Sequence, residues 1–73
     1  MAYQTIPIKA SSNIAAVAWD AETKDLLVTF VRDARQGIYH DVDARTAEGF
    51  RTADSPGRYL NAYVKPFFLY EEI

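Results

Sequence analysis

The residues of this chain that are best placed to do chemistry lie between Ser55 and Lys65. Ser55 followed by Pro56 is typical of a helix start, because the serine hydroxyl can accept from first-turn N–H groups and proline needs no N–H there. Gly57 would let a ligand approach the backbone, and the Arg58 guanidinium can bind a phosphate through two hydrogen bonds. Since a helix start carries unpaired N–H groups and partial positive charge, the pattern predicts an anion-binding corner. The alternative is a well-capped helix without a ligand.

Other side chains in the second half of the chain extend this candidate site. Asn61, one helical turn after Gly57, has an amide that could bond to the edge of a base. Tyrosine rings offer faces on which bases stack, each worth about 1–3 kcal/mol, although the same rings could instead fill the core of so small a domain. The complete predicted nucleic-acid or anion site consists of Ser55, Gly57, Arg58, Tyr59, Asn61, Lys65, Arg45, Arg51 and Tyr39.

Residues for catalysis or metal binding are scarce. His40 is the only histidine, and the chain has no cysteine. If residues 38–42 are extended, His40 points away from Asp41 and Asp43, because alternate side chains lie on opposite faces of a strand. The chain also lacks a nucleophile elbow, a phosphate-binding glycine loop and a dinucleotide fingerprint. We therefore expect no enzyme, no metal site and no cofactor.

Two extended segments, residues 14–20 and 26–32, are expected to position these side chains. Both are rich in aliphatic, β-branched and aromatic residues, and the polar residues 21–24 between them suit a hairpin turn. Both faces of this hairpin are apolar, so we expect helices over one face and a partner or the N-terminal segment over the other. A third strand is predicted at 38–42 and an edge strand at 4–9.

Two short helices are predicted after the strands. Asp43 is a good N-cap for the first helix, and the second runs from Ser55 to a point before Pro66. The tail 67–70 is too apolar to remain in water and should pack back onto the domain or pair as a strand. The expected fold is α+β, a small antiparallel sheet of three to four strands followed by two short helices packed on one face. The predicted core includes Trp19, Phe30 and Phe50.

Length and charge restrict the possible classes of protein. A chain of 73 residues can build one core, so a single domain over residues 1–73 is expected. No apolar stretch is long enough to span a bilayer and no signal peptide is visible, so a cytoplasmic location away from membranes is expected. The net charge is −2, which disfavours a general polyanion-binding surface. Six of the eight cations nevertheless lie after residue 31: Arg32, Arg35, Arg45, Arg51, Arg58 and Lys65.

Several motifs follow one another in a fixed order. They are Ser11-Ser12 with Ile14, Val17-Ala18-Trp19-Asp20 with Thr23, alternating Leu26, Val28 and Phe30, Gly37 with Tyr39, Asp41-Val42, Ser55-x-Gly57-x-Tyr59-x-Asn61, and Val64-Lys65 with Tyr70. This ordered set resembles the KTSC domain family, which is named for its occurrence at the C-terminus of some lysyl-tRNA synthetases. The similarity runs from about residue 9 to residue 70. The chain departs from the family pattern at Ala18, Trp19 and Asp43-Ala44, where glycine, tyrosine and a proline pair are usual.

The resemblance implies a small α+β domain that occurs alone in bacteria and phages or fused to translation proteins, and that has been associated with RNA. We therefore predict a non-enzymatic module that binds RNA or single-stranded nucleic acid. The alternative is a protein-interaction module, either a homodimer or a phage or bacterial accessory protein that docks on a host complex. The acidic net charge, the second apolar strand face (Leu27 and Val31) and the apolar tail favour this alternative. A weaker option is capture of a small anion at Ser55.

Overall fold

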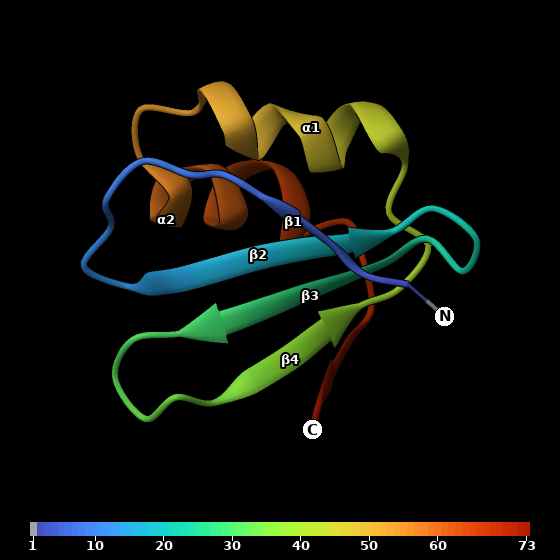
Figure 1. Ribbon diagram of the computed structural model, residues 1–73, viewed down its shortest axis with the longest axis horizontal. Helices are drawn as coiled ribbons and strands as arrows, with labels where there is room; N and C mark the ends of the chain where they lie inside the picture. Colours follow the sequence, from blue (N-terminus) through green and yellow to red (C-terminus); the bar gives the residue numbers. More distant parts are fainter. Residues whose placement is uncertain (1) are drawn as a thin grey trace.

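A five-stranded antiparallel sheet forms one layer of the protein, in a computed structural model that describes residues 2–73 (Figure 1). The strands lie side by side in chain order, so each one pairs with its neighbours in sequence. The sequence predicted three to four strands; the count is five because the C-terminal tail adds a strand at one edge. The strands are β1 (Gln4–Ile6), β2 (Ile14–Asp20), β3 (Asp25–Phe30), β4 (Gln36–Tyr39) and β5 (Tyr70–Glu72).

The β2–β3 hairpin turn is organised by the buried side chain of Asp20. Its carboxylate accepts from the backbone N–H of Glu22 at 2.8 Å and from that of Thr23 at 3.4 Å. These bonds, the one from Glu22 first, hold the pKa of Asp20 below its ordinary value. The predicted first strand agrees with β2, whereas β3 ends at Phe30 and is shorter than the predicted segment 26–32.

Two helices cover one face of the sheet, as the sequence predicted (Figure 1). Asp43 caps the first through its carboxylate, which accepts from the Thr46 N–H at 3.1 Å and from the Thr46 hydroxyl at 2.7 Å. Ser55 caps the second, whose last turn widens into a π-helix closed by a bond from Lys65 N to Leu60 O. The elements are α1 (Ala44–Thr52), α2 (Pro56–Tyr59) and the π-helix η1 (Leu60–Val64).

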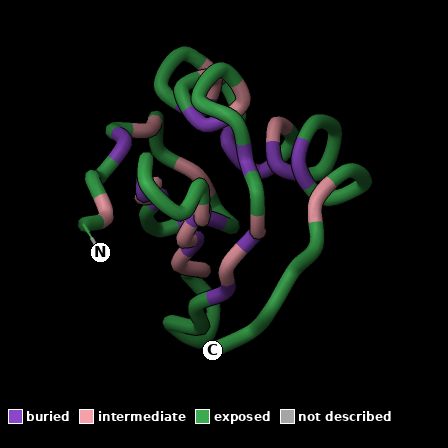
Figure 2. The backbone as a smooth tube through the Cα atoms, turned by 90° about the vertical axis from the view of Figure 1, so that its right-hand side faces the viewer, coloured by how far each residue is buried: buried purple, intermediate pink, exposed green. Residues whose placement is uncertain are grey.

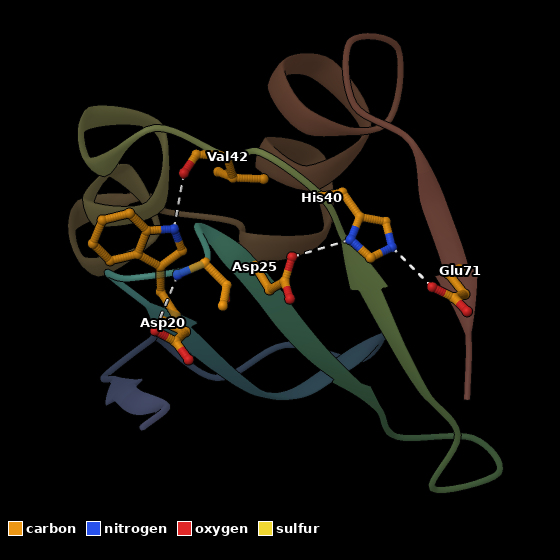
Figure 3. Close-up of polar contacts among 7 residues, drawn as sticks. Asp20, Asp25, His40, Val42 and Glu71 are labelled. Atoms are coloured by element: carbon orange, nitrogen blue, oxygen red, sulfur yellow. Dashed lines mark hydrogen bonds and ion pairs between the residues drawn. The ribbon is translucent and has the colours of Figure 1, made fainter. Parts of the chain in front are cut away.

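β4 ends earlier than the sequence predicted, at Tyr39 rather than at Val42. The cause is a sharp turn at Asp41, whose backbone φ of 59° breaks the extended conformation. Val42 then lies buried, and its carbonyl accepts from the Trp19 indole N–H at 2.9 Å (Figure 3). This bond ties the sheet to the segment that leads into α1.

The core lies between the helices and the inner face of the sheet (Figure 2). Phe50 of α1 is fully buried, which confirms its predicted place. Trp19 and Phe30 are only partly buried and pack against the margin of the core. The buried apolar residues are Ile6, Ile14, Val17, Leu26, Val28, Tyr39, Val42, Ala47, Phe50, Leu60 and Val64.

Tyr59 joins the two helices. Its hydroxyl donates to the carbonyl of Thr46 in α1 at 2.8 Å, and its ring centroid lies 4.7 Å from that of Phe50. An added Cβ at Gly49 would overlap the Tyr59 side chain, so α1 has to carry a glycine where this ring lies against it. The helix pair therefore depends on one side chain that is both packed and hydrogen-bonded.

The substitution Tyr59→Phe should lower the free energy of unfolding by about 1 kcal/mol, because the carbonyl of Thr46 loses a partly buried donor. Urea denaturation followed by circular dichroism measures the change. Tyr63→Phe is the matched control, since the hydroxyl of this exposed tyrosine makes no hydrogen bond within residues 2–73, and it should shift stability by less than about 0.5 kcal/mol. Equal effects of the two substitutions would contradict this role of Tyr59.

Candidate nucleic-acid interface

An open groove of about 890 Å³ lies on the helix-covered side of the sheet. Its walls come from five places in the sequence: the loop before β2, the β3–β4 connection, the end of β4, the α2–η1 segment, and β5. Because the groove is large for so small a domain and combines apolar with charged lining residues, it is the best candidate for a ligand site.

Aromatic rings line part of the groove. Tyr39 is buried and Tyr70 is 43% exposed, with their ring centroids 4.8 Å apart. Burial raises the pKa of the Tyr39 hydroxyl. The Tyr70 ring lies directly against the backbone of Gly37 in β4, where an added Cβ would overlap it. Tyr70 is therefore the ring that is held in place and still offers surface to a ligand.

Three cations border these rings: Arg32, Arg35 and Lys65. The guanidinium of Arg35 lies 3.3 Å from Glu72 of β5 and 3.6 Å from Asp33. Arg32 and Lys65 are exposed and form no ion pair with any residue from 2 to 73. The groove thus combines three cations with two carboxylates and leaves two of the cations available to an anion.

The π-helix η1 supplies one wall. Asn61 and Lys65 both line the groove, and π-helical turns of this kind are frequent at functional sites. Opposite them, Asn13 packs against Gly57, with its Nδ2 atom 3.3 Å from the position that a Cβ would take. The two asparagines place side-chain amides, which both donate and accept, along the same groove as the rings and the cations.

The start of α2 differs from the open anion-binding corner that the sequence suggested. The Ser55 hydroxyl accepts from the Arg58 N–H at 3.3 Å, and its carbonyl accepts from the Tyr59 N–H at 2.9 Å. Pro56 and Gly57 are buried. The glycine at this position therefore serves close packing against the loop that contains Asn13.

The nine residues predicted for the site fall into three groups. The groove brings together Tyr39, Gly57, Asn61 and Lys65. A separate shallow hollow of about 270 Å³ is lined by Ser55, Arg58 and Tyr59. Arg45 and Arg51 are exposed on α1, and Arg51 bonds to Glu48 at 2.9 Å.

The predicted site did not contain Asn13, Arg32, Arg35 and Tyr70, all of which line the groove. The sequence does contain a signal that Arg32 and Arg35 act together, since both lie in the short connection between β3 and β4. Their relation to the tail could not be inferred, because it depends on the pairing of β5. Val31 was expected beside Leu27 on the outer face of the sheet, but it lies beyond the end of β3 and lines the groove.

His40 has partners that its sequence neighbours did not suggest. Its Nδ1 lies 3.0 Å from a carboxylate oxygen of Asp25 in β3, and its Nε2 lies 2.9 Å from one of Glu71 in β5 (Figure 3).

Within residues 2–73, no group of three or more histidine or acidic side chains is arranged to hold a metal ion. No helix in the same range has the length and apolar character needed to cross a membrane.

Comparisons with known proteins agree with the fold. The family model of the KTSC domain matches residues 10–68. The crystal structure of a KTSC domain protein from Yersinia pestis is similar, with a TM-score of 0.86, 28% sequence identity and coverage of 99% of each chain. No curated protein matches the sequence.

The substitution Gly37→Ala should displace Tyr70 and lower the free energy of unfolding by about 1–3 kcal/mol, because the added methyl group would overlap the ring. In a Tyr70→Leu background the same substitution should cost much less. A double-mutant cycle measured by urea denaturation gives this coupling directly. Additive effects would show that the ring and the glycine do not interact.

Proposed function

This chain belongs to the KTSC domain family, and we propose that it is a small non-enzymatic module that binds RNA or another single-stranded nucleic acid in the groove beside η1. The observation that carries the proposal is the position of Tyr70. Its partly exposed ring lies in one groove with the unpaired cations Arg32 and Lys65. An aromatic face next to mobile cations is the combination with which proteins bind single strands, because bases stack while phosphates are neutralised.

Each part of the groove has a task in this proposal. A base stacks on Tyr70, which is worth about 1–3 kcal/mol. Arg32 and Lys65 bind the flanking phosphates, while the amides of Asn13 and Asn61 bond to base edges. Unpaired bases are required, since a base in a duplex cannot present its face to a protein ring.

A finer assignment within the family goes with this function. We propose that the chain is of the lysyl-tRNA synthetase C-terminal type and works in the cytoplasm of a bacterium or in a phage-infected cell. The support is the ordered set of motifs, above all Ser55-x-Gly57-x-Tyr59-x-Asn61. A module of that type would meet RNA as part of its task.

Salt dependence of RNA binding tests the role of the cations. With two cations in the groove available to phosphates, the logarithm of the association constant for short single-stranded RNA should fall against the logarithm of the salt concentration with a slope of about −1.4. Arg32→Gln and Lys65→Gln should each weaken binding and make the slope shallower by about 0.7. Fluorescence anisotropy of a labelled RNA measures both quantities.

The control for charge is Lys24→Gln, because Lys24 lies in the β2–β3 turn and not in the groove. It should leave the affinity and the slope unchanged. Tyr70→Leu separates stacking from charge, since the loss of about 1–3 kcal/mol of stacking should weaken binding about five- to 150-fold without changing the slope. Undetectable RNA binding, or binding that ignores salt, would refute the proposal.

Self-association is a second candidate function, favoured by the outer face of the sheet. Leu69 and Ile73 are 80% and 66% exposed at its edge. The strand register places Ala18, Leu27 and Ile38 in one row across β2, β3 and β4, on the face away from the helices. We propose that a second copy of the chain covers this face, because apolar side chains that remain partly exposed on one face are a common site of association.

Sedimentation equilibrium tests self-association. The wild-type chain should form a dimer as its concentration rises, and Leu69→Lys should shift the equilibrium to the monomer, because it introduces a charge at the edge of the sheet. Phe67→Lys provides a comparison, since Phe67 is also exposed but lies in the turn after η1, whereas Leu69 is bonded to the edge of the sheet through its carbonyl. A wild-type chain that stays monomeric at all concentrations would exclude the dimer.

A further inference from the structure

Strand β5 is the least anchored part of the sheet. It consists of three exposed residues at an edge and pairs only with β4. The buried apolar core of residues 2–73 begins at Ile6 and ends at Val64, so it contains no residue of β5. Since segments with few buried contacts open at low cost, individual side-chain bonds can decide whether β5 stays paired.

His40 supplies such bonds. Its two ring nitrogens contact two carboxylates from different strands, Asp25 of β3 and Glu71 of β5, at 3.0 Å and 2.9 Å (Figure 3). A neutral imidazole has one N–H, and an ionised carboxylate can only accept. Both contacts are therefore hydrogen bonds only when the ring carries two protons and a positive charge.

We propose that Asp25, His40 and Glu71 form a proton-operated latch, which holds β5 on the sheet when the imidazole is protonated and loosens it when the imidazole is neutral. Because Tyr70 and Glu72 of β5 line the groove, the latch also sets the shape of one groove wall. That consequence for binding rests on the proposed function, whereas the latch itself does not.

The charged surroundings of the ring favour its protonated form. Besides the two carboxylates in contact with it, a third carboxylate, Asp20, lies opposite Asp25 in the strand register. Burial first, and then the negative charges of Asp25 and Asp20, raise the pKa of the Tyr3 hydroxyl. Lys24 precedes Asp25 and adds a cation, and Asp41 follows His40 and adds one further carboxylate. The titratable groups around the latch are Asp25, Glu71, Asp20, Tyr3, Lys24 and Asp41.

The direction of the pH dependence follows from these contacts. Hydrogen bonds to Asp25 first and then to Glu71 raise the pKa of His40 above 6.5. A raised pKa in the folded state means that the stabilising contribution is complete below the ordinary value and is lost as the pH rises through the folded value. The latch therefore closes in mild acid and opens as the pH rises through the raised pKa of His40.

Amide hydrogen exchange of the free protein tests the latch without any ligand. The N–H of His40 donates to Leu69 O at 2.9 Å and that of Ile73 donates to Gln36 O at 3.0 Å, so both report on β5. Between about pH 5.5 and about pH 9, protection of these two amides, corrected for the intrinsic exchange rate, should fall about tenfold. The amide of Val28 in the central strand β3 should keep its protection.

Two exposed substitutions complete the experiment. Glu71→Gln removes the carboxylate of β5 that contacts His40 and should give low protection of Ile73 that no longer depends on pH in this range. Glu22→Gln, in the β2–β3 turn, should retain the wild-type profile. Protection of Ile73 that is independent of pH in the wild type, or an unchanged profile in Glu71→Gln, would overturn the latch. Failure to bind RNA in the same buffers would contradict the proposed function alone.

Discussion

The contact between the Tyr70 ring and the bare backbone of Gly37 determines where the C-terminal tail lies. A side chain at position 37 would occupy the space of the ring, so the ring can reach β4 only at a glycine. Of the other apolar residues in the tail, Phe68 packs against the core before β5 begins, whereas Phe67 and Leu69 are 71% and 80% exposed. The ring therefore sets the register of β5, and that register brings Glu72 to Arg35 and completes the groove.

The groove lies where a rigid core meets a loosely held edge. Leu60 is a buried core residue and Phe30 packs against the core, so their side of the groove is fixed. The opposite wall belongs to β5, whose residues are all exposed and whose side-chain bonds are charged or aromatic. A small domain needs most of its apolar residues to form its core. A site whose movable wall contributes nothing to that core can adjust without unfolding the protein.

Local patterns in the sequence were sufficient for about half of this structure. The alternation and turn chemistry around Asp20 define the β2–β3 hairpin, and Asp43 and Ser55 are caps whose partners lie within one turn. The π-helix was not predictable, because an apolar stripe with four-residue spacing fits an α-helix equally well. The sequence predicted β5 only as one of two alternatives, since the tail was expected either to pack back onto the domain or to pair as a strand. Its register, like the His40 bridge, depends on residues about 30 positions apart, such as Gly37 and Tyr70.

The candidate site was only partly predicted for the same reason, and the net charge was a poor guide to it. Acidic residues crowd the β2–β3 turn, whereas Arg32 lies beyond the other end of β3, a strand that is roughly 17 Å long at about 3.4 Å per residue. At physiological ionic strength the Debye length is about 8 Å, so the carboxylates of that turn act only weakly on an anion in the groove. The groups that decide its potential are therefore those within the groove itself. In the groove, Glu72 already forms an ion pair with Arg35, while Arg32 and Lys65 are exposed to solvent. An acidic chain can thus present a locally cationic surface, because screening separates the two ends of the hairpin.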